Sequence, residues 1–340
     1  MKRVVTFGEI MLRLAPEGYA RFVQAERFGA VYGGGEANVA VSLANFGIDA
    51  AFVTKLPCHE IGQAAVNSLR RYGVDTRGIL RGGDRLGIYF LEQGASQRPS
   101  KVIYDRAGSA FALAQPEEYD WKRLLEGADW FYFTGITPAL GERVAQACLQ
   151  ACRAAKELGL TVGCDLNYRM NLWSRQEAER VMTALMPYVD VCISSEANAA
   201  DVFGIRAESG AGGAGQTDPE SCRAVARELA QRFGFAKVAV TRRGSISASD
   251  NDWAAMLYDG GEYYYSRNYH IHIVDRIGGG DSFGAGLIYS QLMDFSPQES
   301  IEFAAAASCL KHTVEGDCNL VSVQEVQLLA GGDGSGRVQR

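Results

Sequence analysis

The segment Val274-Asp275-Arg276-Ile277-Gly278-Gly279-Gly280-Asp281-Ser282-Phe283-Gly284-Ala285-Gly286 decides the fold. It predicts an extended strand end, a glycine turn, and then an apolar helix that continues to Met293. Three consecutive glycines allow the backbone to approach a ligand closely, and the first amides of the helix lie at the positive end of its dipole. We therefore expect an anion-binding site where the turn enters the helix.

Asp281 would lie in the first turn of that helix. A carboxylate there could accept a proton from an attacking hydroxyl, while the amides of Gly278 to Gly280 stabilise charge on transferring phosphoryl oxygens. The alternative is that Asp281 is only a helix N-cap. Capping accounts for one aspartate but not for the adjacent glycines. We predict that Asp281 is a catalytic base and that Gly278, Gly279 and Gly280 form an anion hole.

A second glycine turn, Gly33-Gly34-Gly35-Glu36-Ala37-Asn38-Val39-Ala40, leads into a helix that ends near Phe46. Asn38 is expected at its mouth. An amide both donates and accepts hydrogen bonds, which suits the vicinal hydroxyls of a polyol. Glycines before a helix are often only a turn. We predict that Gly34, Gly35 and Asn38 bind a substrate.

Short β-branched and aromatic runs alternate with amphipathic stretches along the chain, which predicts a doubly wound, mostly parallel α/β sheet flanked by helices. The expected strands are Val4 to Phe7, Ala51 to Thr54, Trp130 to Thr134, Leu160 to Asp165, Val189 to Ile193 and Lys237 to Thr241. Apolar residues at three and four spacing predict helices at Glu142 to Leu158, Arg175 to Met186 and Ser221 to Phe233.

Two regions break this rhythm, at about 11–32 and 84–112. Their patterns are typical of antiparallel strands, which predicts a small sheet that projects from the main domain as a lid. The alternative is that they are extra edge strands. Residues 1–325 are expected to form one domain. The tail 326–340, rich in glycine from Gly331 to Gly336, is expected to be disordered.

Composition excludes several classes of protein. The chain has 340 residues, 47% of them hydrophobic, and a net charge of −6, which argues against a nucleic-acid partner. No apolar run approaches the roughly 20 residues that span a bilayer, and no signal core follows the N-terminus, so a cytoplasmic protein is expected. The eight cysteines form no Cys-x-x-Cys pair and are expected to be reduced. Four histidines offer no structural zinc site.

The segment Gly210 to Gly215 matches a dinucleotide-binding glycine pattern. That pattern must follow a strand and run into a helix, whereas here a separate helix start, Asp218-Pro219-Glu220, comes after it. We interpret it as a surface loop. An oxidoreductase built on this segment is the competing hypothesis.

Together the two glycine turns resemble the paired signatures of the ribokinase-like (PfkB) carbohydrate kinase family, Gly-Gly-x-x-x-Asn and Asp-x-x-Gly-x-Gly-Asp. The resemblance covers nearly the whole chain. It implies a ribokinase-like fold with a β-sheet lid, with Asp281 as the base and Gly278 to Gly280 as the anion hole. It also implies ATP and Mg²⁺ as cofactors, a monovalent cation near Asp275, and a homodimer formed through the lid.

Tyrosines and arginines indicate the kind of sugar. A sugar acid calls for a guanidinium that can pair with its carboxylate. Four residues, Tyr89, Tyr104, Arg106 and Arg169, resemble those that hold the substrate in the 2-keto-3-deoxygluconate kinases of the family. The arginines could instead be solvated surface charges or contact the nucleotide phosphates. A kinase for a neutral sugar such as fructose or ribose is the rival within the same class.

The nucleotide side also rests on the resemblance. The segment Val238 to Ser245 and the helix Ala304 to Thr313 are similar to those beside ATP in the family, and the residues assigned to the nucleotide are Asn167, Glu196, Thr241, Gly244, Gly280 and Ser308. One departure stands out. The family's Asn-x-x-Glu motif, linked to magnesium, falls on Ser195-Glu196-Ala197-Asn198, where Glu196 is expected to act on Mg²⁺ indirectly. A non-catalytic sugar or nucleotide sensor is therefore a further hypothesis.

The resemblance and the residues lead to one expected reaction. ATP would phosphorylate 2-keto-3-deoxygluconate at its primary hydroxyl to give the 6-phosphate.

Overall fold

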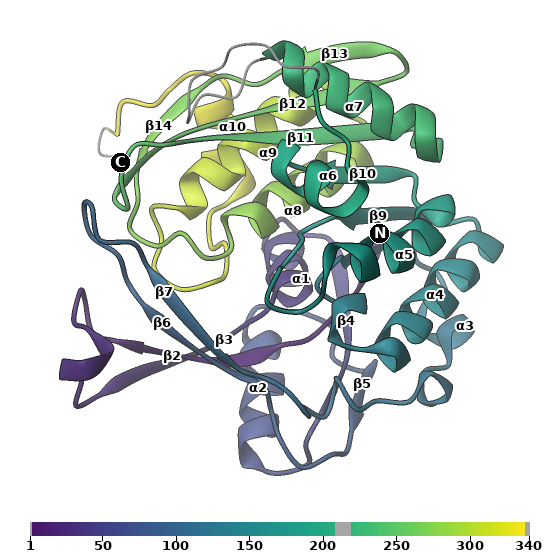
Figure 1. Cartoon of the computed structure of the whole chain (residues 1–340), viewed down its shortest axis with the longest axis vertical. Coiled ribbons are helices and arrows are strands. Elements are labelled where there is room, and N and C mark those ends of the chain that lie inside the picture. Colours follow the sequence, from purple (N-terminus) through teal and green to yellow (C-terminus); the bar gives the residue numbers. More distant parts are fainter. Residues whose placement is uncertain (1, 208–218, 337–340) are drawn as a thin grey trace.

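A computed structural model describes residues 2–207 and 219–336 of the chain (Figure 1). Its main feature is a ten-stranded sheet in the order β13-β12-β11-β10-β9-β8-β1-β4-β5, with β14 paired to β12. The strands are β1 (Arg3–Phe7), β4 (Asp49–Leu56), β5 (Ile79–Arg81), β8 (Trp130–Thr134), β9 (Thr161–Asp165), β10 (Val191–Ser194), β11 (Lys237–Ser245), β12 (Asp250–Asp259), β13 (Glu262–Tyr265) and β14 (Tyr269–His272).

The six strands predicted from the sequence are confirmed, and they pair with one another in parallel, as predicted. Their side chains alternate between two apolar layers. Val4 packs on one face of the sheet and Val5 on the other, as the two-residue period of a strand requires. Because both faces are covered, these strands are almost continuously apolar.

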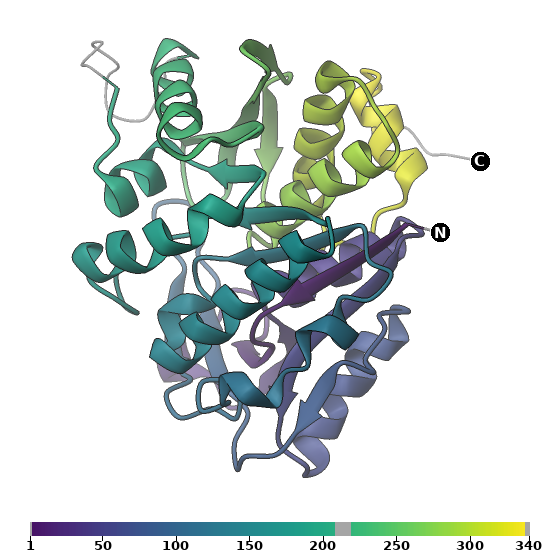
Figure 2. The ribbon, with the colours of Figure 1, turned by 90° about the vertical axis from the view of Figure 1, so that its right-hand side faces the viewer.

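Helices cover both faces of the sheet (Figures 1 and 2). One layer contains α3 (Trp121–Leu124), α4 (Glu142–Glu157), α5 (Arg175–Leu185), α6 (Glu196–Phe203) and α7 (Pro219–Phe233). The other contains α1 (Gly35–Asn45), α2 (Glu60–Arg71), α8 (Gly279–Leu292) and α9 (Pro297–Lys311), with α10 (Val323–Ala330) packed behind α9. Short 3-10 helices lie at η1 (Phe22–Gln24), η2 (Pro116–Glu118), η3 (Pro138–Leu140) and η4 (Met186–Tyr188).

The antiparallel edge of the sheet beyond β11 was not predicted, although a strand was expected at His270 and His272. There the chain turns back, and β12, β13 and β14 are all antiparallel to their neighbours. Trp253, Ala255 and Leu257 in β12 are buried in the apolar layer that also contains α8 and α9. This antiparallel edge therefore closes the core beside the glycine turn.

A separate four-stranded sheet has the order β3-β2-β6-β7 and projects from the main body (Figure 1). Its strands are β2 (Met11–Pro16), β3 (Phe28–Gly33), β6 (Ile88–Glu92) and β7 (Lys101–Asp105). The predicted small sheet is thus confirmed, and the alternative of extra edge strands is wrong. We refer to these four strands as the small sheet.

The C-terminal prediction needs correction, because residues 326–330 are helical. Ser322 caps α10 through a reciprocal pair of hydrogen bonds with Glu325, and Val326 is fully buried. The tail prediction took the glycines after Ala330 as its guide and began too early. Residues 337–340 lie outside the described part of the chain, as does the segment Gly210 to Gly215.

All eight cysteines are free, and Cys148, Cys152, Cys164 and Cys192 are buried in the core. No helix among residues 2–207 and 219–336 is long and apolar enough to cross a membrane.

Candidate active site

A cavity of about 590 Å³ opens where the parallel strands end, between the large sheet, the small sheet and the start of α8. Ligands of open α/β sheets bind at this edge. The cavity brings together residues predicted from distant parts of the sequence, namely Gly34, Gly35, Asn38, Tyr89, Tyr104, Arg106, Asn167, Arg169, Glu196, Thr241, Gly278, Gly280 and Asp281. Gly244, Asp275, Gly279 and Ser308 are predicted site residues that do not line it.

The glycine turn is fixed from behind by the segment that follows α9. Gly278 is the N-cap of α8 with φ of 81°, a left-handed conformation that favours glycine. A methyl group on Gly278 would overlap the backbone of Asp317, and one on Gly279 would overlap the ring of His312. Gly280, by contrast, faces open space. The turn therefore needs glycine on its inner side and offers its outer side to a ligand.

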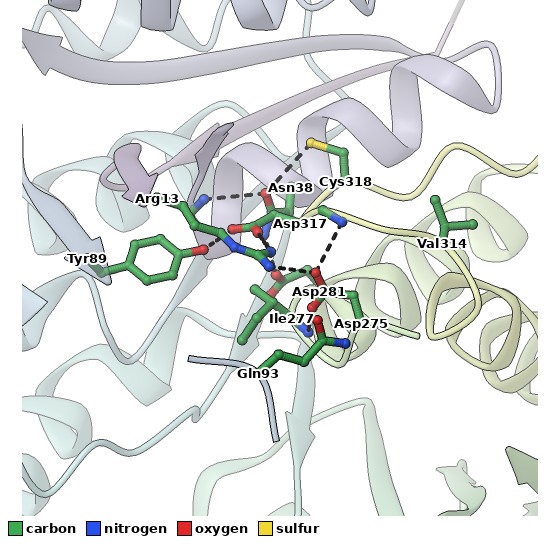
Figure 3. Close-up of polar contacts among 12 residues, drawn as sticks. Arg13, Asn38, Tyr89, Gln93, Asp275, Ile277, Asp281, Val314, Asp317 and Cys318 are labelled. Carbon is green, nitrogen blue, oxygen red and sulfur yellow. Dashed lines mark hydrogen bonds and ion pairs between the residues drawn. The ribbon is translucent and has the colours of Figure 1, made fainter. Parts of the chain in front are cut away.

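Asp281 is the third residue of α8, and Gly278 is its cap, so the N-cap alternative is wrong. The carboxylate faces the cavity, where Oδ2 accepts a 2.7 Å hydrogen bond from Asn38 Nδ2 (Figure 3). Asn38 Oδ1 in turn accepts a bond from the Gly34 amide at 3.3 Å. The second glycine turn thus positions Asp281, a role for Asn38 that sequence reasoning missed.

The pKa of Asp281 is raised to about 7. Burial is the main cause, and the nearby carboxyl groups of Asp165, Glu36 and Asp317 add to it, while the hydrogen bond from Asn38 acts in the opposite direction. A general base works best when its pKa lies near the working pH. Asp281 is therefore suited to take a proton from a hydroxyl at neutral pH.

Among the other carboxyl groups of the cavity wall, Glu36 and Asp165 act on the pKa of Asp281, and neither was predicted as a site residue. Glu36 accepts hydrogen bonds from the Thr134 amide and hydroxyl, both at 2.9 Å, and from the Thr137 hydroxyl at 2.7 Å, and burial raises its pKa. Burial also raises the pKa of Asp165 to about 7. The position of Asp165 as the last residue of a buried strand was an available signal. Both groups make the surroundings of Asp281 more negative.

Arg106 is buried and not a solvated surface charge, so that alternative is wrong for this residue. Its Nε donates to Glu9 Oε2 at 2.8 Å, and Nη2 donates to the same oxygen. The Ser109 hydroxyl also donates to Glu9. The charge of Arg106 is therefore already balanced, which leaves its predicted contact with a substrate carboxylate to compete with Glu9.

Three other arginines line the cavity, and none forms a salt bridge within the described part of the chain: Arg169, Arg243 and Arg276. Arg169 donates only to the Tyr168 carbonyl, at 2.9 Å. Burial, together with Arg276 and Arg169, lowers the pKa of Arg243 to about 10. The cavity thus combines the Asp281 carboxylate with three arginines that form no salt bridge in the described part of the chain. Arg243 lies in the segment predicted beside ATP, but neither Arg243 nor Arg276 was assigned a role from the sequence.

The residues predicted at a nucleotide lie in different places. Thr241 donates to the Ser194 carbonyl at 3.3 Å and lines the cavity, and Asn167 lines it in a left-handed conformation with φ of 35°. Ser308 is fully buried beneath the turn, where its hydroxyl donates to the Gly279 carbonyl at 2.7 Å. Gly244 lies on β11 against Asp252. Nucleotide contacts of Ser308 and Gly244 stay predictions.

The altered magnesium motif has a structural role. Ser195 caps α6 by accepting a bond from the Asn198 amide at 3.2 Å. The adjacent Glu196 lines the cavity, and its Oε1 is buried with no hydrogen-bond partner in the described part of the chain. No group of three His, Cys, Asp or Glu side chains among residues 2–207 and 219–336 could hold a metal ion.

A buried charge network ties the small sheet to the glycine turn. Arg13 of β2 donates to Asp317 Oδ1 at 2.6 Å and to Asp275 Oδ2 at 2.7 Å, and the Tyr89 hydroxyl of β6 also donates to Asp317 (Figure 3). Arg13 and Asp317 were not predicted. Tyr89, predicted as a substrate contact, is buried, and its hydroxyl donates to Asp317 within this network.

A doubly wound sheet with a small second sheet, and a carboxylate in the first turn of a helix that follows a glycine turn, are the features expected of a sugar kinase of the α/β type. The comparison with known families agrees, since residues 1–324 match the family described as pfkB family carbohydrate kinase. The chain belongs to this family.

Individual relatives are similar over nearly their whole length. A 2-dehydro-3-deoxygalactonokinase of Haloferax volcanii is 37% identical over 97% of each chain. The crystal structure of a 2-dehydro-3-deoxygluconokinase from Thermotoga maritima has a TM-score of 0.94 and 50% identity, and covers 97% of this chain and 98% of that one. A putative ribokinase II from E. coli in complex with ATP and Mg²⁺ shares the fold, with a TM-score of 0.81, 20% identity, and 97% and 99% covered.

Proposed function

We propose that the protein transfers the terminal phosphoryl group of Mg-ATP to the primary hydroxyl of 2-keto-3-deoxygluconate, which gives the 6-phosphate. The observation that carries this proposal is the Asp281 carboxylate, held by Asn38 in a cavity that is also lined by three arginines without a salt bridge in the described part of the chain. Two of the relatives described above act on 2-keto-3-deoxy sugar acids that differ in configuration at one carbon. The galactonate epimer is therefore the second candidate.

Asp281 would take the proton of the attacking hydroxyl. The amides at the start of α8 would stabilise charge on the transferring phosphoryl oxygens, because the positive end of the helix dipole points at them. Phosphoryl transfer depends mainly on positioning and electrostatic stabilisation. Asn38 and the carboxyl groups around Asp281 thus serve the step by orienting the base and keeping its pKa near 7.

Arg169, Arg243 and Arg276 are suited to bind the two anionic substrates of the reaction. A nucleotide triphosphate and a sugar carboxylate both pair well with guanidinium groups. We assign Arg243 and Arg276 to the phosphates, because they lie with Thr241 near the end of β11 and the glycine turn, and Arg169 to the carboxylate.

Magnesium would be held mostly by phosphate oxygens and water, as is usual for this ion. Glu196 fits an indirect role, since its buried Oε1 faces the cavity without a partner in the described chain. When bound, Mg²⁺ neutralises charge on the phosphates. The predicted monovalent cation fits less well, because Asp275 Oδ2 already accepts bonds from Arg13 and from the Gly316 amide.

The small sheet would act as the lid over the sugar and exclude water from the reaction. It would also form the dimer contact. Its face opposite Arg13 and Tyr89 exposes apolar side chains that a monomer would leave in water, with exposed fractions of 40% for Phe28 and 53% for Ile103.

A comparison of ATP turnover with five acceptors tests the substrate: 2-keto-3-deoxygluconate, its galactonate epimer, gluconate, fructose and ribose. We expect kcat/KM for the two keto acids to be at least about tenfold higher than for the neutral sugars, because one charged hydrogen bond contributes about 1.5–3 kcal/mol. Faster turnover of fructose would refute the sugar-acid assignment. Binding of a keto acid without any phosphorylated product would favour a sensor.

Arg169→Ala tests the carboxylate contact. We expect KM for the keto acid to rise about 10- to 100-fold with little change in KM for ATP, because the lost charged hydrogen bond is worth about 1.5–3 kcal/mol. Arg143→Ala, at an exposed site on α4, is the matched control and should leave both constants unchanged. A rise in KM for ATP alone would place Arg169 at the phosphates instead.

A further inference from the structure

A buried lysine, Lys311, lies outside the residues assigned to catalysis and substrate binding. Lys311, the last residue of α9, is fully buried, and its Nζ donates to the Val314 carbonyl at 3.1 Å and to the Asp275 carbonyl at 3.4 Å. Within the described chain it forms no salt bridge. A lysine is almost never fully buried unless its charge has partners, because desolvation of an ammonium group is costly. The position of Lys311 therefore requires a specific explanation.

The ammonium lies directly behind the anion hole. A methyl group on Gly278 would lie 3.3 Å from Lys311 Cε. The strand end before the turn is fastened to the same region, since the amides of Val274 and Asp275 donate to the His312 carbonyl at 2.8 and 3.2 Å. Lys311 Nζ thus binds carbonyls from both sides of the junction between the glycine turn and the segment after α9.

The charge has electrostatic support at this position. The C-terminal end of α9 carries the negative end of its dipole, which favours a cation. The pKa of Lys311 is lowered by burial and by the charge of Arg13, while the carboxylates of Asp275 and Asp317 act in the opposite direction and favour the charged form. Arg13 shares these two carboxylates from the other side.

Main-chain carbonyls around a small, dehydrated cation are the ligands that proteins use for K⁺. Here the ligands are already engaged. Asp275 Oδ1 accepts the Ile277 amide at 3.0 Å, its Oδ2 accepts Arg13 and Gly316, and its carbonyl accepts Lys311. A monovalent cation beside Asp275, as predicted from the sequence, does not fit this set of contacts.

We propose that the Lys311 ammonium takes the place of a monovalent cation behind the anion hole and makes the protein independent of K⁺. Lys311 is then a positioning residue, which fixes the Asp275 carbonyl and hence the Gly278 turn without touching the substrate. The inference rests on the proposed phosphoryl transfer only for its kinetic readout, since the site itself is structural.

The first test uses the unaltered protein. KCl is replaced by tetramethylammonium chloride at constant ionic strength, and the thermal midpoint, Kd for Mg-ATP and kcat are measured. We expect Kd and kcat to stay within about twofold and the thermal midpoint to stay the same, because dialysis cannot remove an internal charge. Screening by the bulk salt is the same in both solutions, since the ionic strength is held constant. Saturable activation or stabilisation by K⁺ would overturn the proposal.

The second test removes the ammonium in Lys311→Ala and, as the matched control that keeps the volume filled, in Lys311→Met. In tetramethylammonium, both variants should lose at least about tenfold in kcat, because a shift of the turn by a fraction of an ångström misaligns the base and the phosphate. K⁺ or NH₄⁺ should restore the thermal midpoint and kcat of Lys311→Ala with saturation, and should restore neither in Lys311→Met.

Crystals of the Lys311→Ala protein soaked in RbCl give a readout independent of activity. We expect an anomalous peak among the carbonyls of Asp275 and Val314 in the variant, and none there in the unaltered protein. The proposal would be overturned if monovalent cations changed neither the thermal midpoint nor the kcat of Lys311→Ala and gave no anomalous peak in its crystals. The midpoint and the peak need no sugar, so a wrong substrate assignment would leave them intact. If Lys311→Ala does not fold in any salt, restoration of Lys311→Met by K⁺ or a K⁺ requirement of the unaltered protein would still refute it.

Discussion

Asp281→Asn is expected to lower kcat by about 10²–10⁴-fold, the usual contribution of a general base in phosphoryl or acyl transfer. The asparagine keeps the shape of the side chain and can still contact Asn38, but it cannot accept the hydroxyl proton. Kd for Mg-ATP and for the keto acid, measured by calorimetry, should change by less than about threefold. Equal losses in binding and in turnover would instead indicate that the variant disturbs the α8 turn.

The pH profile separates loss of the base from general damage. Because the pKa of Asp281 is raised to about 7, the base is protonated and inactive below this pH and active above it, so the rate should rise through pH 7 to a plateau. That limb should vanish in Asp281→Asn. In Asp165→Asn it should persist and move to lower pH, because a like charge that raises the pKa of Asp281 is removed. An unchanged limb in Asp281→Asn would assign the titration to another group.

Local pattern predicted most of what is local in this protein. Each of the six central strands coincides with an apolar run in the sequence, and each glycine turn directly precedes its helix. The cavity residues on these elements could therefore be named from the sequence. The end of the domain was misjudged because the glycines after Ala330 outweighed the capping box at Ser322.

Pairings between distant charges left no such signal. Arg13 stands in an otherwise apolar strand, and its partners Asp275 and Asp317 follow it by 262 and 304 residues. Arg106 likewise meets Glu9 only because β7 and β1 converge at the cavity. The sequence pattern predicts that such residues lie on a strand or a loop, but the register and the crossing of two sheets decide which charges meet. For the same reason, the roles of Arg243, Arg276 and Lys311 could not be predicted from the sequence.

These distant pairs matter because they join the two sheets by charge as well as by apolar contact. The apolar cluster beneath the small sheet contains Met11, Tyr89 and Leu91, with Ala15 and Ile277 packed against it, while Leu12 and Tyr32 pack against the main core. Arg13 is therefore the main polar anchor between the small sheet and the glycine turn. An arginine that serves two buried carboxylates cannot be removed without leaving both unpaired.

Arg13→Ala should accordingly lower the free energy of unfolding by about 3–5 kcal/mol, the cost of breaking a buried ion pair by removal of one partner. Urea unfolding followed by circular dichroism measures this loss. Arg77→Ala is the control, because Arg77 also pairs with an aspartate but is 84% exposed, and such surface pairs contribute only about 0–1 kcal/mol. Amide hydrogen exchange should also accelerate in β2 and β6 before it does in β1 or β8, since the small sheet loses its anchor. A loss no larger than that of Arg77→Ala would mean that the apolar contacts around Met11 and Tyr89 hold the two sheets together without Arg13.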